Sequence, residues 1–209
     1  MITRVIVYFF IIISNIIARD FIPPKGWDEL HNDNNWEVVK ENNQIRVCKK
    51  VISVTTFLAF RIEYTTDVSP FKLIQTIWDI DDAYKVFGNS FITHSGIYET
   101  HDSNYQSVYQ IIDVPFLTPR LYQFDFFQNN NQINWVKINH SHPDLKDEFI
   151  IPKLNFGSWK IRIGEKENTI IYRVCTHPEG DIPNWMVEQA NQWYLPQMLL
   201  DLEKWAQNN

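Results

Sequence analysis

The chain has 209 residues, 44% of them hydrophobic, which is enough material for one domain with a proper core. Its net charge is −6, from 19 Lys and Arg against 25 Asp and Glu, and no basic run exceeds two residues. We therefore expect no nucleic-acid partner and no electrostatic recruitment to anionic membranes. Aromatic residues make up 15% of the chain, and such bulky side chains suit a wide interior better than a small tight bundle.

The first eighteen residues have the pattern of a secretory signal peptide. Arg4 precedes an apolar run over residues 5–13, and the small residue Ala18 follows it. This order is typical of a signal that is cleaved near Ala18. An uncleaved membrane anchor is the alternative, but the apolar run is shorter than the ~20 residues of a spanning helix. The sequence thus predicts a signal peptide at residues 1–18, one domain at residues 19–209, and a secreted or periplasmic protein.

Alternation of apolar and polar residues dominates the middle of the chain. It is clearest in residues 57–66, 104–113 and 119–128. A period of two is typical of half-buried antiparallel strands. In the second segment it groups Tyr109 with Tyr105, Ser107 and Ile111, and in the third it groups Arg120, Tyr122, Phe124 and Phe126. Polar turn segments separate the predicted strands, at residues 40–44, 101–104, 129–132 and 164–168.

Helical patterning first occurs in residues 69–88. Ser69 can cap a helix and Pro70 suits its first position. The apolar face that we predict consists of Phe71, Ile74, Ile77 and Trp78. A break near residues 79–81 predicts a second short helix that ends at Gly88.

A long terminal helix is predicted for residues 182–206. Asp181 offers a capping oxygen and Pro183 a preset φ at its start. Pro196 is expected to kink the helix, because it removes a hydrogen bond and crowds the preceding turn. The apolar residues before and after Pro196 fall on different sides, so the two halves are expected to cover different surfaces.

The order of predicted elements is two or three strands, a helical insertion, about six strands and one long helix. This order favours an α+β fold with a mostly antiparallel sheet. An amphipathic helix that closes over a curved, aromatic-rich sheet can enclose an apolar cavity. On the pattern alone, ordinary core packing is the simpler interpretation.

Five segments in a fixed order make residues 27–207 resemble the START family of lipid-transfer domains. They are "WEVVKENNQIRVCKKV", "FLAFRIEY", "PFKLIQTIWDIDDAYKVF", "QSVYQIIDVPFLTPRLYQFDF" and "NTIIYRVCTHPEGDIPNWMV". The chain departs from the family pattern at three positions. Leu121 follows Arg120 where the family usually has an acid, His177 stands where an Asp usually precedes Pro-x-Gly, and Glu188 stands where an Asn is common.

The resemblance implies a helix-grip fold, in which a curved antiparallel sheet wraps around the C-terminal helix and leaves a lipid-sized tunnel. It implies a monomer that binds a lipid or sterol-like molecule without a cofactor or metal, with transient membrane contact. The candidate ligand-binding residues are Tyr109, Arg120, Tyr122, Phe124, Trp185, Met186, Gln189, Ala190 and Trp193. One strand would separate the strands of Cys48 and Cys175, too far for a disulfide, so we expect two free buried thiols.

Signals of catalysis are weak. The sequence has no nucleophile elbow, Walker A or dinucleotide-binding motif. His140, His142 and Asp144 could imitate a metal site, but a solvated turn is the simpler interpretation. The alternative functions are a helix-grip enzyme, a cyclase or hydrolase that uses Gln189 or His94, and a protein-binding module whose cavity is filled by its own side chains.

Arg120 is predicted to point inward with its strand neighbours, and a buried guanidinium needs a partner. Two partners are open: an internal carboxylate such as Glu99 or Asp113, or a polar group of the ligand.

Overall fold

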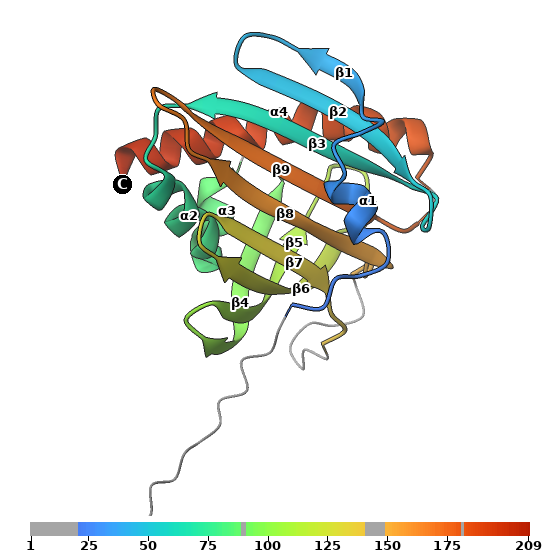
Figure 1. The fold of residues 1–209 in the computed structure, drawn as a ribbon. Coiled ribbons are helices and arrows are strands. Elements are labelled where there is room, and N and C mark those ends of the chain that lie inside the picture. Colours follow the sequence, from blue (N-terminus) through green and yellow to red (C-terminus); the bar gives the residue numbers. More distant parts are fainter. Residues whose placement is uncertain (1–20, 89–90, 141–148, 181) are drawn as a thin grey trace, which may run out of the picture.

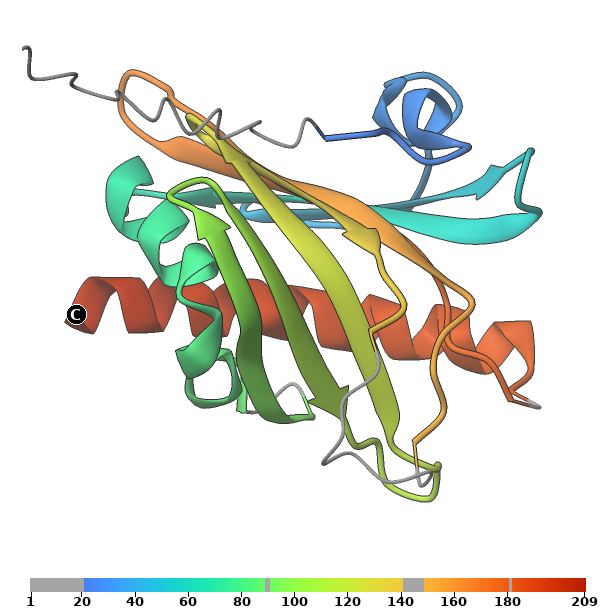
Figure 2. The same ribbon diagram turned by 90° about the horizontal axis from the view of Figure 1, so that it is seen from below.

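The computed structural model describes residues 21–88, 91–140, 149–180 and 182–209. The expected signal peptide at residues 1–18 therefore lies outside the described residues. Within these ranges, a single curved sheet of nine strands lies against a long C-terminal helix (Figures 1 and 2). The predicted α+β helix-grip fold is confirmed.

The strands are β1 Glu37–Glu41, β2 Ile45–Ile52, β3 Phe57–Thr66, β4 Ile92–Asp102, β5 Tyr105–Ile112, β6 Arg120–Asn129, β7 Gln132–Lys137, β8 Leu154–Arg162 and β9 Asn168–His177. The helices are α1 Trp27–His31, α2 Pro70–Trp78, α3 Ala83–Val86 and α4 Asn184–Asn208, with a 3-10 turn, η1, at Ile80–Asp82.

The sheet order is β1-β2-β3-β9-β8-β7-β6-β5-β4, and all neighbours are antiparallel. Each strand pairs with the next one along the chain, except that β3 pairs with β9. Alternating side chains therefore face α4 or the opposite side of the sheet. The largest buried cluster lies on the α4 side.

The helical insertion follows its prediction in outline. Pro70 begins α2, and the chain breaks at Asp79 before η1 and α3. Ser69 takes the capping position, but its side chain makes no capping hydrogen bond. One detail of the predicted face is wrong: Phe71 is 74% exposed, and Leu73 lies with Ile74 and Ile77 in the buried arc.

The terminal helix continues through Pro196 as one helix (Figure 2). It begins at Asn184, with Pro183 at the capping position, and the proposed cap Asp181 lies outside the described residues. The second half of α4 supplies the fully or largely buried core residues Leu195, Met198, Leu199 and Leu202. The first half is mostly exposed or half-buried. The two halves thus differ in burial, and the expectation that they cover different surfaces stays a prediction.

Cys48 and Cys175 are both free and buried, and β3 lies between their strands, as the resemblance predicts. Burial raises the pKa of the Cys175 thiol to about 12.

Close packing of the sheet depends on Gly157 in β8. A Cβ there would lie 2.1 Å from the carbonyl oxygen of Arg173 and 2.4 Å from the Trp135 ring.

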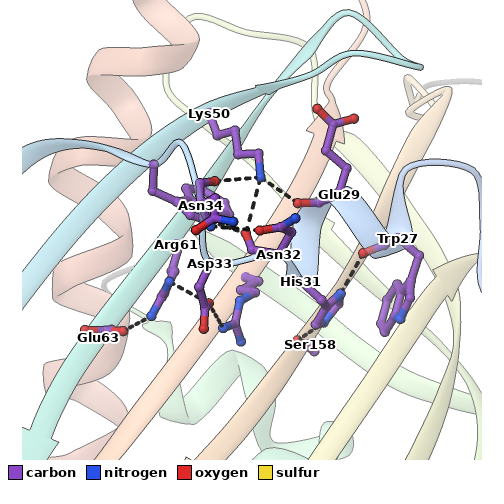
Figure 3. Close-up of polar contacts among 12 residues, drawn as sticks. Trp27, Glu29, His31, Asn32, Asp33, Asn34, Lys50, Arg61, Glu63 and Ser158 are labelled. Carbon is purple, nitrogen blue, oxygen red and sulfur yellow. Dashed lines mark hydrogen bonds and ion pairs between the residues drawn. The ribbon is translucent and has the colours of Figure 1, made fainter.

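The N-terminal segment of residues 27–36 lies on the face of the sheet opposite to α4 and contains α1, a helix that the sequence pattern did not predict (Figures 2 and 3). The Lys50 ammonium donates to the carbonyl oxygens of Glu29, Asn32 and Asn34 at 2.7, 3.2 and 3.1 Å. Asp33 accepts from Arg61 at 2.8 Å and from Arg173 at 3.0 Å.

His31 of α1 completes this attachment. Its two ring nitrogens contact the Trp27 carbonyl oxygen at 2.9 Å and the Ser158 hydroxyl at 2.8 Å (Figure 3). Burial lowers the pKa of His31 to about 4. The imidazole is therefore neutral at physiological pH.

Candidate functional site: an internal cavity under the terminal helix

A cavity of about 670 Å³ lies between the inner face of the sheet and α4. Its lining residues come from β5, β6, β7, β8 and β9, from the helical insertion and from α4. Most of them are apolar or aromatic. This volume falls within the ~300–1,000 Å³ that is usual for small-molecule sites.

The two ends of the cavity, which lie toward opposite ends of the strands, differ in chemistry. Along β6, Arg120 and Tyr122 come first, and Phe124 and Phe126 follow. The start of β6, the end of β5, the start of β8 and the end of β9 lie at the same end of the sheet, because the neighbours are antiparallel. We call this the polar end, with Gln110, Arg120, Tyr122, Asn155 and Thr176 in its lining. The aromatic end is lined by Phe87, Phe124, Phe126, Trp135 and Trp159.

Arg120 lies inside the wall, with only 4% of its surface exposed. Its Nε donates to the Pro178 carbonyl oxygen at 3.4 Å and one Nη to the Glu179 carbonyl oxygen at 3.3 Å. The other Nη donates to the carbonyl oxygen of Thr118. Of the two partners left open, the carboxylate of Glu99 or Asp113 does not pair with Arg120. Two loops distant in sequence supply backbone acceptors instead.

Exposed apolar side chains surround the opening of the cavity. Phe116, in the loop between β5 and β6, is fully exposed and also belongs to the lining. Trp193 and Met186 of α4 are 75% and 38% exposed. Phe91 stacks in parallel with Tyr194 at 6.2 Å between ring centres. The opening thus lies between the β5–β6 loop and the first half of α4.

Six of the nine candidate residues line the cavity: Arg120, Tyr122, Phe124, Met186, Ala190 and Trp193. Tyr109, Trp185 and Gln189 are not among the lining residues. Tyr109 alternates with the lining residue Gln110 and packs over Gly96 on the opposite face of β5. Trp185 and Gln189 lie on an exposed side of α4. Ligand binding by any of the nine stays a prediction.

Several lining residues were not among the predicted ones: Trp135, Asn155, Trp159, Tyr172 and Tyr194. A period of two was present in "INWV" and "NFGSWKI" and could have placed the two tryptophans and Asn155 on one face.

Apart from Arg120, the described lining residues carry no charged side chain and include no His or Cys. Tyr122, Tyr172 and Tyr194 all have a pKa raised by burial, so their hydroxyls stay protonated. Such hydroxyls form hydrogen bonds but are poor bases at neutral pH.

A second polar cluster, on the outer face of β4, β5 and β6, has the composition of a catalytic triad. His101 contacts the Ser107 hydroxyl at 2.9 Å and Glu99 at 3.5 Å. Ser107, however, donates to Asp125 at 2.6 Å, so its hydroxyl proton is committed to a carboxylate and not to the imidazole. Asp125 also accepts from Tyr105 at 3.0 Å. This cluster joins strands and lacks the proton relay of a nucleophile.

Within the described ranges, no group of three metal-ligating side chains comes together. His142 and Asp144 of the weak candidate metal site lie outside the described residues. His140 stacks on Tyr98 with ring centres 4.4 Å apart. No helix in the described part of the chain is long and apolar enough to cross a membrane.

A curved antiparallel sheet that grips a C-terminal helix over an internal apolar cavity defines the START-type helix-grip fold, and the chain has this fold. Among solved structures it is similar to a STAR-related lipid transfer protein from Xanthomonas axonopodis, with a TM-score of 0.72 and 15% identity over 83% of this chain and 99% of that one. It is also similar to human STARD10, with a TM-score of 0.74 and 16% identity over 89% and 80% of the two chains.

The same fold also carries enzymes. The aromatase/cyclase ZhuI from Streptomyces sp. R1128 matches with a TM-score of 0.56 and 13% identity, over 71% of this chain and 93% of that one. No family model and no curated protein matches the sequence.

Proposed function

We propose that the protein binds one hydrophobic molecule, a lipid or a sterol-like compound, in the internal cavity and carries or senses it without transforming it. The cavity of about 670 Å³ under α4 is the observation that carries this proposal. Burying ~300 Å² of ligand hydrocarbon at about 25 cal/mol per Å² contributes ~7.5 kcal/mol before the costs of association. The likeness to structures named as lipid transfer proteins supports the same function.

An enzyme of the cyclase type is the second candidate, because the fold is shared with aromatase/cyclases. The described lining residues favour binding, since they offer no carboxylate, imidazole or thiol to act as a base. The third candidate, a protein-binding module, needs a filled interior, and the open cavity disfavours it.

The proposed ligand exchanges through the opening between the β5–β6 loop and α4. Phe116 and Trp193 expose apolar surface there, and aromatic rings of this kind suit the interfacial region of a bilayer. Transient contact with a membrane is therefore part of the proposal. So are a monomeric state and the absence of a nucleic-acid partner, which agrees with the net charge of −6.

Extraction of the purified protein with organic solvent, followed by mass spectrometry, tests this function. The extract should contain a hydrophobic compound at a near-stoichiometric amount. The control is the same protein unfolded in urea, washed and refolded, which should release the compound and regain it from a lipid extract. Turnover of a soluble substrate analogue, with no compound retained, would favour the enzyme instead.

Export is a separate proposal that rests on the apolar run and Ala18. N-terminal sequencing of the exported protein should begin close to Arg19. Recovery of the chain with Met1 intact in a membrane fraction would favour the anchor.

A further inference from the structure

Two side-chain amides at the polar end of the cavity have N–H donors with no acceptor among the described residues. Asn155 is only 7% exposed, and its Oδ1 accepts from the Trp135 indole N–H at 3.2 Å. An indole nitrogen can only donate, so the atom that it meets must be the amide oxygen. The two N–H donors of Asn155 are then left for whatever occupies the cavity. Gln110 is half-buried and lines the same end, and its side chain makes no hydrogen bond with a described residue.

These donors need an acceptor. A buried polar group without a hydrogen bond costs about 1–3 kcal/mol, and this cost disappears when water or a ligand oxygen supplies the partner. The site is roomy and polar enough for either one. Gln110 lies on β5 and Asn155 on β8, with β6 and β7 between them, so a ligand oxygen can satisfy one of the two amides while water serves the other.

Two tyrosine hydroxyls extend the hydrogen-bonding surface toward the middle of the cavity. The hydroxyls of Tyr172 and Tyr194 have no hydrogen-bond partner among the described residues, although both rings are well packed. Tyr122 and Tyr172 are close enough to interact electrostatically. A hydroxyl both donates and accepts, so it can bond to a neutral alcohol or carbonyl equally well.

Arg120 does not demand an anionic ligand. Each of its three nitrogens already donates to a backbone carbonyl, in the segments at Thr118 and at residues 178–179. The guanidinium also lies against Gly180, where a Cβ would come within 3.4 Å of it. Its evident role is to hold these two segments together at the wall of the polar end.

The aromatic end offers no comparable group. Trp135 gives its only donor to Asn155, and Trp159 packs on Tyr172 with ring centres 4.4 Å apart. Phe124 and Phe126 complete this region with purely apolar surface. Hydrocarbon placed here loses no hydrogen bond.

We propose that the cavity selects an amphiphile with one small uncharged oxygen group, a hydroxyl or a carbonyl, and orients it. The oxygen lies at the polar end, where the side chains of Gln110 and Asn155 and the tyrosine hydroxyls offer hydrogen bonds, and the hydrocarbon lies against the aromatic end. This inference rests on the proposed function, because it specifies the ligand of the same cavity.

Displacement of the neutral probe Nile red by three matched chains tests the inference. The competitors are oleyl alcohol, oleic acid at pH 8 and 9-octadecene, which share a chain length and differ only at one end. The alcohol should displace the probe at a concentration about tenfold lower than the hydrocarbon, the advantage of one or two net hydrogen bonds. Oleic acid should compete less well than the alcohol, because its ionised carboxylate must leave water.

Two substitutions localise the selectivity. Gln110→Met keeps side-chain length, and Tyr172→Phe removes a single hydroxyl that no described residue uses. Each should shrink the advantage of the alcohol over the hydrocarbon, with both ligands measured on the same variant, by about threefold or more. Tyr84→Phe, which changes an exposed tyrosine outside the cavity, is the matched control.

The outcomes separate the two levels of the proposal. If all three chains displace the probe equally, or if the acid is preferred, the orientation and the uncharged head group are wrong while hydrophobic binding stands. If neither Nile red nor any competitor binds to the lipid-free protein, the proposed function fails and this inference fails with it. Retention of the full alcohol preference in both variants would also overturn the inference.

Discussion

Replacing Ala190 with Trp tests whether the first half of α4 is the wall of a ligand cavity. Ala190 lines the cavity and is exposed, so an indole can extend over the opening without displacing core side chains. If the indole excludes ~100 Å² of ligand from apolar contact, the loss at about 25 cal/mol per Å² is ~2.5 kcal/mol, or roughly 70-fold in Kd. Stability should change by less than about 0.5 kcal/mol, as is usual for exposed positions.

Titration of a fluorescent lipid measures the binding, and thermal denaturation of the lipid-free protein measures the stability. Gln189→Trp is the matched control, because this neighbour is exposed and outside the lining, and it should preserve both. Ala206→Trp, on the same helix but only 1% exposed, should cost ~1–3 kcal/mol by overpacking. If Ala190→Trp loses stability as Ala206→Trp does, this face is ordinary core. Unchanged lipid affinity would place the ligand elsewhere.

Three further predictions concern the scaffold. Gly157→Ala should lower the free energy of unfolding in urea by ~3 kcal/mol, because the added Cβ has no space. Gly88→Ala is the control and should change this free energy little, because a Cβ there meets no described atom within 4 Å. Equal effects of the two substitutions would contradict the packing argument. Folding lowers the pKa of His31 from 6.5 to about 4, so between these pH values the histidine is protonated in the unfolded chain but not in the folded one. The free energy of unfolding should therefore fall by up to ~3 kcal/mol as the pH is lowered from about 6.5 to 4. His31→Gln should show a smaller fall between these pH values, and an identical fall would exclude this histidine as the cause. Cys48 and Cys175 should resist a thiol reagent in the native protein and both react in urea; fewer than two reactive thiols in urea would indicate a disulfide.

Much of the fold was predictable because its signals are local. Strand alternation, turn residues and the Pro70 helix start each depend on a few neighbouring residues, and all of them agree with the structure. The short α1 was missed because its attachment depends on partners from distant strands, such as Lys50, Arg61 and Ser158. Phe71 is exposed although it lies on the apolar side of α2, because a wide apolar side does not show which of its residues point into the core.

The site was less predictable, for reasons that particular residues make clear. Alternation grouped Tyr109 with its strand neighbours correctly, but both faces of β5 are substantially buried, so the pattern could not show which face meets α4. Arg120 was expected to meet either a carboxylate or a polar group of the ligand. It bonds instead to carbonyl oxygens of two loops, and every residue type supplies such acceptors. A cavity is space that side chains leave empty, and no sequence pattern reports it.

The pairing of β3 with β9 has a consequence for how the chain folds. All other neighbouring strands are consecutive in sequence and can form as hairpins, while Thr66 must find Asn168, 102 residues further along the chain. Closing that long loop costs entropy that local contacts do not repay, so this step should limit the folding rate. Until it occurs, β3 and β9 each expose an unpaired edge, and this interval is when the chain is most vulnerable to aggregation.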